Sequence, residues 1–266
     1  MTNFSHLKCY ANKTNNCSTK ISAEHFISDN ILKGFEQNKT VKLTGLPWIE
    51  NQTFNLLSRK SLVSNILCTN HNKDLSPYDS EAGNFHRCIA DFDADFNNQT
   101  PINETRKFNG DFIEKWMLKT ICGLIASNQI AVNSQRQNVV LKEKYVDLLF
   151  NNEEWPISWG LYFKLPENKQ IHKFDCISVL PYTGNNEVKA AEFLFNNFVF
   201  NLSLGKPDKP ELWGIHRVNK IHFTNGKVIK TIELEWNDLK YDKWVSLTRT
   251  TTTTQTPSDW KDWMKK

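Results

Sequence analysis

The spacing of apolar residues changes about halfway along the chain, and this change restricts the folds that the chain can adopt. From about residue 75 to residue 150 the apolar residues of the predicted helices recur every three or four positions, which is typical of helices packed on one face. From 151 to 247 they tend to alternate, which is typical of strands in a half-buried sheet. Helices followed by strands, rather than interleaved with them, predict an α+β fold.

The clearest helical stripe predicts a helix over residues 75–96. Ser76 suits the N-cap, and Pro77 suits the first helical position, where its missing N–H costs nothing. The stripe comprises Leu75, Tyr78, Ala82, Phe85, Ile89, Phe92 and Phe96. It leaves an acidic face that we expect to be solvated, with Asp91, Asp93 and Asp95.

Two shorter helices are predicted next, one from about Asp111, a good N-cap, to Ser127, and one over residues 141–150. The remainder predicts five or six strands in a mostly antiparallel β region. Aromatic and β-branched residues indicate strands at 159–163, 174–180 and 192–204. Asn225-Gly226, between two strand-like runs, is a strong signal for a hairpin turn.

These patterns divide the chain into four parts. Residues 1–104 form a head that ends in the long helix, and 105–150 form a helical connector. Residues 151–247 form the β-rich domain. The last part, 248–266, is expected to be a flexible tail in which a threonine run precedes a short amphipathic helix.

The net charge of +4 is unevenly distributed along the chain. Residues 1–73 carry nine Lys or Arg against four Asp or Glu, whereas 74–104 carry one against seven. A basic head permits a polyanionic partner. No apolar run approaches the ~20 residues that a membrane helix needs, and the N-terminus shows no apolar signal segment. We therefore expect a cytoplasmic protein without a membrane partner.

The six cysteines fall into two groups. In a cytosolic protein disulfides are rare, so isolated cysteines are typical core residues and grouped ones indicate metal binding or catalysis. Three have apolar neighbours and are expected to be buried: Cys88, Cys122 and Cys176. The other three lie in polar segments, where a thiol has little reason to pack: Cys9, Cys17 and Cys68.

Cys68 and His71 have the short spacing that lets two ligands from one turn reach a tetrahedral ion. Cys9 and Cys17 could supply the second pair, which would complete a structural zinc site with three cysteines and one histidine. Their seven-residue interval is longer than the usual two to four. The alternative is that Cys9 and Cys17 are ordinary reduced thiols on a polar loop.

Glu24 and His25 lie where a short strand is expected to end, and Ser28-Asp29 then begins a helix through Ile31, Leu32 and Phe35. Taken alone, such a pair is more often a surface or capping pair than a catalytic one. A neutral histidine can nevertheless accept a proton near pH 7, and a carboxylate is a typical magnesium ligand.

Together these residues resemble the HNH nucleases, whose fold is a ββα unit built around a metal ion. The resemblance covers residues 6–96 and rests on Cys9, Cys17, Glu24, His25, Leu67, Cys68, His71 and Asn72. It implies that His25 is the general base and that Glu24 and Asn72 hold a catalytic Mg²⁺ or Mn²⁺. It also implies that the cysteines and His71 bind a structural Zn²⁺ that stabilises a small module.

The chain departs from the family pattern at three points. The 42 residues between His25 and Cys68 require a looped-out insertion, which we expect around residues 45–48. Asn65 is the nearest candidate for the middle asparagine and is assigned a supporting role. His71 could bind the catalytic metal instead of zinc.

The resemblance implies a metal-dependent endonuclease that hydrolyses phosphodiester bonds, in DNA rather than RNA, with restriction or anti-phage defence as its role. Residues suited to the phosphate backbone are Lys8, Lys13, Lys20, Lys33, Arg59 and Lys60, with Lys39 and Lys42 nearby. One alternative is a zinc-stabilised nucleic-acid-binding or adaptor protein without activity. The β region could recognise the substrate or a protein partner, or form a separate sugar- or peptide-binding module.

Overall fold

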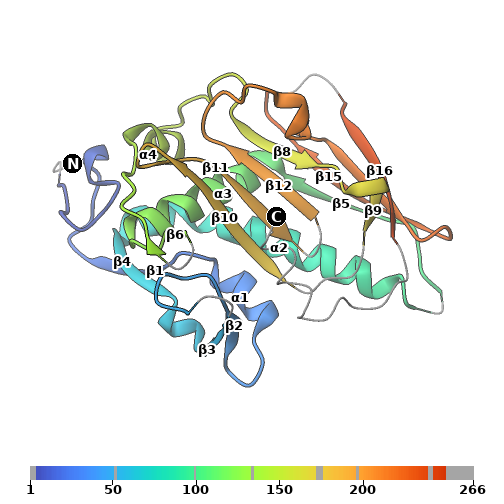
Figure 1. Cartoon of the computed structure of the whole chain (residues 1–266), viewed down its shortest axis with the longest axis horizontal. Helices are drawn as coiled ribbons and strands as arrows, with labels where there is room; N and C mark the ends of the chain where they lie inside the picture. The colour runs from blue at the N-terminus through green and yellow to red at the C-terminus, as the bar shows by residue number, and fades with distance from the viewer. Residues whose placement is uncertain are drawn as a thin grey trace.

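Two five-stranded sheets and a pair of long helices make up most of the molecule (Figure 1). The computed structural model describes residues 4–50, 53–98, 100–132, 135–171, 176–195, 198–238 and 242–249. Four α-helices and several sheets occur within these ranges, which agrees with the expected α+β class. The helices are α1 (Asp29–Phe35), α2 (Thr69–Asp95), α3 (Gly110–Ala126) and α4 (Glu143–Phe150), with 3-10 turns η1 (Asn12–Thr14), η2 (Arg59–Ser61), η3 (Glu167–Lys169) and η4 (Pro210–Leu212).

The first sheet is antiparallel and has the strand order β10-β11-β12-β8-β13. The single strand expected over 192–204 is instead two paired strands. Residues 174–175 of the strand expected over 174–180 lie outside the described ranges, and among the described residues this strand begins at Ile177. The bounds are β8 (Gly160–Lys164), β10 (Ile177–Gly184), β11 (Glu187–Phe195), β12 (Phe198–Ser203) and β13 (Ile215–His216).

The second sheet is mixed, with the order β5-β15-β14-β16-β9. Only its β14–β15 hairpin is antiparallel, and this hairpin confirms the Asn225-Gly226 turn, where Gly226 has φ +88°. The β5 strand comes from the expected connector and pairs in parallel with β15. The bounds are β5 (Glu104–Asn109), β9 (Gln170–Ile171), β14 (Lys220–Thr224), β15 (Ile229–Glu235) and β16 (Trp244–Arg249).

Helices α2 and α3 pack side by side against the sheets (Figure 1). Phe85 of α2 contacts Phe108, Phe195 and Phe200 with ring centroids 5.4, 5.6 and 5.8 Å apart. Trp116 of α3 is fully buried and contacts the first sheet as well. The apolar residues that alternate along β11 and β12 therefore point toward this helix pair. Cys88, Cys122 and Cys176 are buried, as expected.

The acidic face of α2 is solvated as expected only at Asp91, which is exposed, whereas Asp93 and Asp95 are partly buried; each of the three pairs with a base from the second sheet. Asp91 lies 2.7 Å from Arg106, and Asp93 lies 2.5 Å from Arg249. Asp95 pairs with Lys230, whose side chain is fully buried. Charge pairing thus accompanies apolar packing along the second half of this helix.

Residues 4–68, called here the N-terminal region, form two small antiparallel sheets at the lower left of Figure 1. Strand β1 (Ile21–His25) pairs with β4 (Val63–Cys68), and β2 (Val41–Leu43) pairs with β3 (Asn55–Leu57). Outside this region, β6 (Ala131–Val132) and β7 (Gln135–Arg136) form a third short pair. The β2–β3 hairpin lies within the insertion expected between His25 and Cys68.

Helix α2 begins at Thr69, directly after β4, and not at Pro77 as the stripe alone predicts. The helix therefore starts about two turns earlier than the apolar stripe predicts, and its first turn includes His71 and Asn72. Pro77 lies inside the helix, where it removes one backbone hydrogen bond. The buried side chains on both sides of Pro77, including His71, Leu75 and Phe85, hold the two halves in line.

Helix α3 begins two residues earlier than expected, because its N-cap is Asn109 rather than Asp111. The Asn109 side chain accepts a hydrogen bond from the Phe112 amide at 3.0 Å. Asp111 lies in the first turn, where its carboxylate accepts a bond from the Asn237 amide at 3.0 Å. Helices α1 and α4 match their expected positions.

The tail expected over 248–266 begins inside β16, and residues 250–266 lie outside the described ranges. No helix among the described residues is both long and apolar enough to cross a bilayer.

Candidate functional site

Four of the candidate site residues predicted from the sequence lie on the β1–β4 pair, namely Glu24, His25, Asn65 and Cys68. Ile21 pairs with Cys68 and His25 with Val63, so Glu24 and His25 lie at the far end of the pair from Cys68. The loop with Cys9 and Cys17 packs over the near end, where the Tyr10 amide donates to the Ile66 carbonyl at 2.9 Å.

The structure brings Cys9, Cys17, Cys68 and His71 together in one buried cluster. Their candidate ligand atoms all lie within 4.8 Å of one another. The Nδ1 atom of His71 is 3.1 Å from the Cys68 sulfur, 3.3 Å from that of Cys9 and 3.7 Å from that of Cys17. Four soft or borderline ligands converge on one point from two chain segments, an arrangement that could hold a metal ion in a closed, four-ligand site.

Thr14 fixes which nitrogen of His71 faces the sulfurs. Its hydroxyl donates to the Ala11 carbonyl at 2.8 Å, so its oxygen accepts from Nε2 of His71 at 2.7 Å. Nε2 therefore carries the hydrogen, and Nδ1 presents its lone pair to the cysteines. Metal-bound histidines are typically oriented in this way by a partner on the other ring nitrogen. Burial also lowers the pKa of His71, which favours the neutral ring.

The surroundings of the cysteines fit a cation. Burial raises the pKa of the Cys9 thiol to about 12, so this thiolate is costly unless a positive charge compensates it. The Ser18 amide donates to the Cys68 sulfur at 3.4 Å, an orientation that stabilises a thiolate. The donor set, its burial and its hydrogen bonds all fit Zn²⁺, and a metal such as zinc is the species this cluster could bind.

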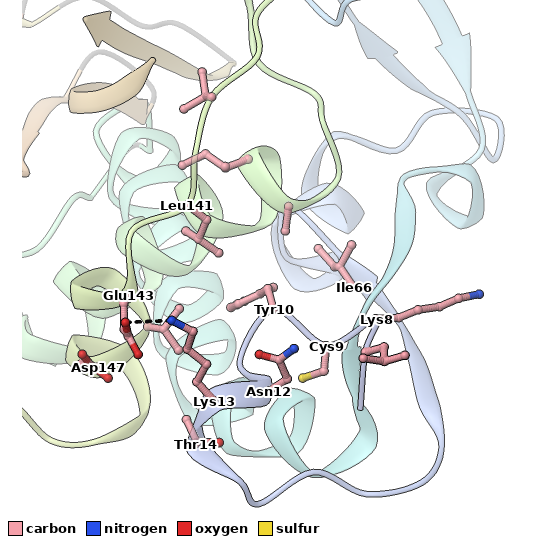
Figure 2. Close-up of a pocket in the computed structure, with 15 residues that line it drawn as sticks. Lys8, Cys9, Tyr10, Asn12, Lys13, Thr14, Ile66, Leu141, Glu143 and Asp147 are labelled. Carbon is pink, nitrogen blue, oxygen red and sulfur yellow. Dashed lines mark hydrogen bonds and ion pairs between the residues drawn. The ribbon is translucent and has the colours of Figure 1, made fainter. Parts of the chain in front are cut away.

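A cavity of about 450 Å³ borders the cluster on the side of Cys9 (Figure 2). Much of its wall is apolar, and an ion pair of 2.9 Å between Lys13 and Glu143 spans it, as the dashed line in Figure 2 shows. Lys8 and Asp147 add one more charge of each sign. The cavity therefore favours neither anions nor cations, and it does not form part of the candidate site.

Glu24 points into the protein interior. Its Oε1 lies 2.5 Å from the Lys119 ammonium, which also lies 2.6 and 2.7 Å from the two oxygens of Asp79. Ser28 donates to Asp79 and accepts from the Trp116 indole N–H at 2.6 Å. Burial raises the pKa of Glu24, and Lys119 offsets part of that shift.

His25 lies on the outer side of β1, half-buried. Its Nε2 is 3.2 Å from the Arg59 carbonyl oxygen and 3.7 Å from Asp29. A carbonyl can only accept, so Nε2 carries the hydrogen and Nδ1 is the basic atom of the neutral ring. Burial lowers the pKa of His25, although Asp29 acts in the opposite direction.

Asn72 lies at the start of α2 and donates through Nδ2 to the Ser22 hydroxyl of β1 at 2.6 Å. Asn65 is exposed on β4. Among the described residues, no hydrogen bond or ion pair joins Glu24, His25 and Asn72 to one another. The sequence-predicted set therefore separates into one buried cluster that could bind a metal and three dispersed polar residues.

The basic residues of the N-terminal region are exposed or partly exposed, and several are already paired. Arg59 contacts Asp29 and lies 3.0 Å from Glu36, while Lys33 lies 3.0 Å from Asp29. Lys13 is paired across the cavity, whereas Lys8, Lys20 and Lys60 are exposed.

Sequence reasoning missed Lys119, Asp79, Ser28 and Thr14. Of these, only Lys119 could have been identified from the sequence, because a lysine on the apolar face of a predicted helix needs a buried partner. No family model, curated protein or solved structure matches the chain, so residue roles rest on the chemistry of the site.

Proposed function

We propose that this protein is a metal-dependent endonuclease of the HNH type that hydrolyses phosphodiester bonds in nucleic acid. The observation that carries the proposal is the Cys9–Cys17–Cys68–His71 cluster, which ties the antiparallel β1–β4 pair to the N-terminus of α2. A strand pair followed directly by a helix and held by a metal is the ββα arrangement that the resemblance implies. Zinc is the proposed occupant of the cluster.

His25 is the proposed general base. Hydrolysis needs a group that removes a proton from water, and Nδ1 of His25 is the unprotonated atom of a ring held at its other nitrogen by the Arg59 carbonyl. Because burial lowers its pKa, the ring stays neutral at pH 7 and available as a base. The rate should therefore fall as the pH drops through that lowered pKa.

The proposed ligands of a catalytic cation are Asn72 and Glu24. Asn72 uses its Nδ2 for Ser22, which leaves its Oδ1 available to a cation. Glu24 is less accessible, because a cation would have to compete with Lys119 for its carboxylate. A bound Mg²⁺ or Mn²⁺ would supply positive charge to the phosphate and to the leaving oxygen.

The exposed lysines of the N-terminal region support a phosphate-bearing substrate, since backbone phosphates are held mainly by Lys and Arg. DNA rather than RNA, and a role in restriction or anti-phage defence, remain predictions. A protein partner on the β-rich part is supported by Leu180 and Tyr182, which are exposed on the edge strand β10.

The test is incubation of the purified chain with supercoiled plasmid and with RNA in Mg²⁺, Mn²⁺ or EDTA. His25→Ala should lower the rate by about 10²–10⁴-fold with little change in affinity, as expected on loss of a general base. His222→Ala is the matched control, because His222 is also half-buried but lies on β14 of the second sheet. A folded His25→Ala protein that cuts at the parental rate would refute the role of His25.

A second candidate is a zinc-stabilised nucleic-acid-binding protein that does not cut. The engagement of Glu24 by the buried Lys119 favours it, because this carboxylate already has a partner inside the chain. Binding of labelled DNA without cleavage in any of the three metal conditions would select this alternative.

A further inference from the structure

The β2–β3 hairpin presents an apolar face to solvent. Lys42 pairs with Leu56 across the hairpin, and Phe54 precedes Leu56 by two residues, so all three side chains lie on one face. Phe54 is 52% exposed and Leu56 is 61% exposed. The Lys42 ammonium lies 3.9 Å from the centre of the Phe54 ring, which is a cation–π contact.

The opposite face anchors this hairpin to the protein. Val41 is 2% exposed, and its partner Leu57 packs against the hydrophobic core. In the loop between the strands, Ile49 is buried and the Trp48 indole donates to Gln129 at 3.1 Å. The exposed apolar face is therefore held in place and does not result from a loose loop.

The hairpin leads directly to Arg59, whose carbonyl contacts the candidate catalytic residue His25. The chain leaves β3 at Leu57 and reaches Arg59 two residues later, and the carbonyl of Arg59 is the group that orients His25. Exposed Lys39, Lys42 and Lys60 surround this segment. Residues 36–60 contain two acids, Glu36 and Glu50, and Glu36 is already paired with Arg59. The surface thus combines net positive charge with an aromatic ring.

We propose that the outer face of the β2–β3 hairpin contacts the nucleic acid beside the bond to be cut, with Phe54 stacked on an unpaired or unstacked base. This inference rests on the proposed function and names the form of substrate that the site would favour. Exposed aromatic rings bind bases by stacking, neighbouring lysines bind the adjoining phosphates, and apolar side chains such as Leu56 can wedge between base steps.

The experiment measures binding separately from cutting. Fluorescence anisotropy, without added divalent cations, is used with a fluorescein-labelled 20-nucleotide single strand and with its duplex. Phe54→Ala should raise the Kd for the single strand by about tenfold, the loss expected for one stacked base. Phe54→Trp should retain parental affinity. Lys42→Ala should reduce the slope of log K against log salt by about 0.7.

Trp244→Ala is the matched control, because Trp244 is 62% exposed but lies on β16 of the second sheet. Its Kd should stay within twofold of the parent. Mass photometry of the parent and Phe54→Ala proteins should give the same mass. A Phe54-dependent oligomer would identify the face as a self-association surface and overturn the proposal.

Failure of this inference can be distinguished from failure of the proposed function. If the parent binds and cuts nucleic acid while Phe54→Ala binds equally well, only the role of the hairpin is overturned. If the parent neither binds nor cuts, the proposed function fails, and the inference fails with it.

Discussion

The N-terminal region and the two large sheets are stabilised by different means. The sheets bury rows of aromatic residues against α2 and α3, with Phe85 and Trp116 at the centre. The described residues of the N-terminal region form short two-stranded sheets, two 3-10 turns and the seven-residue helix α1, and the distinctive interior feature of this region is the Cys3His cluster. Small modules that bury little apolar surface commonly rely on metal ligation for stability.

Helix α2 joins the two regions, because its first turn carries His71 and Asn72 and its last turns lie along the second sheet. The comparison therefore predicts that loss of metal affects mainly the N-terminal region, whereas loss of an aromatic contact affects the whole chain. The four predictions below test this difference, from the largest expected effect to the smallest.

Removal of the metal should have the largest effect. We expect about one zinc per chain by elemental analysis, and Cys68→Ser should abolish it. Structural zinc contributes on the order of 10 kcal/mol in small modules, so amide exchange should rise sharply across residues 4–68 while β11 and β12 stay protected. Cys176→Ala, a buried cysteine outside the cluster, is the control. Unchanged zinc content in Cys68→Ser would contradict the assignment.

Truncation of the aromatic core should have the next largest effect. Phe85→Ala removes three ring contacts, and should lower the free energy of unfolding by about 3–5 kcal/mol in urea denaturation. Phe54→Ala, which truncates an exposed ring, should change it by less than about 0.5 kcal/mol. Equal losses in the two variants would mean that the core is not centred on Phe85.

Removal of a buried charge should have the third largest effect. Lys119→Met leaves Glu24 and Asp79 without their shared cation, and breaking such a buried pair typically costs about 3 kcal/mol or more. Burial already raises the pKa of Glu24 above its unfolded value, so the folded state binds the extra proton. The variant should therefore be relatively more stable at pH 6 than at pH 8, as urea denaturation at each pH can show.

A second substitution provides the control for Lys119. Glu24→Gln combined with Lys119→Met should recover part of the lost stability, because one of the two carboxylates is then neutral. A Lys119→Met protein with parental stability at both pH values would show that Lys119 is not the partner of these carboxylates.

The smallest effect is expected at the surface between the two regions. Lys13 and Glu143 connect η1 to α4 at 2.9 Å, but their side chains are 69% and 58% exposed. Lys13→Ala should lower the free energy of unfolding by less than about 1 kcal/mol, and the difference should shrink further in 1 M salt. A larger loss would assign this ion pair a structural role in joining the two regions.

Local sequence patterns determined much of the candidate site. The spacing of Cys68 and His71, with Cys9 and Cys17 ahead of them, predicted a metal cluster that the structure brings together. Helix α3 and the Asn225-Gly226 hairpin were also predicted, because helical periodicity and turn chemistry depend on neighbouring residues. By contrast, the pattern at Pro77 placed the start of α2 too late, since only the packed core holds a helix on both sides of a proline.

The amino-acid sequence by itself determined the α+β class, the alternating strands and the four candidate metal ligands, because these depend on local periodicity and spacing. Only the tertiary structure decided which distant charges meet. Asp95 was expected on a solvent-exposed face, but it contacts the buried Lys230. Glu24 was expected to bind a catalytic cation, but it contacts Lys119. Periodicity shows which face of an element is apolar, but the partner of a buried charge depends on which elements the fold brings against it.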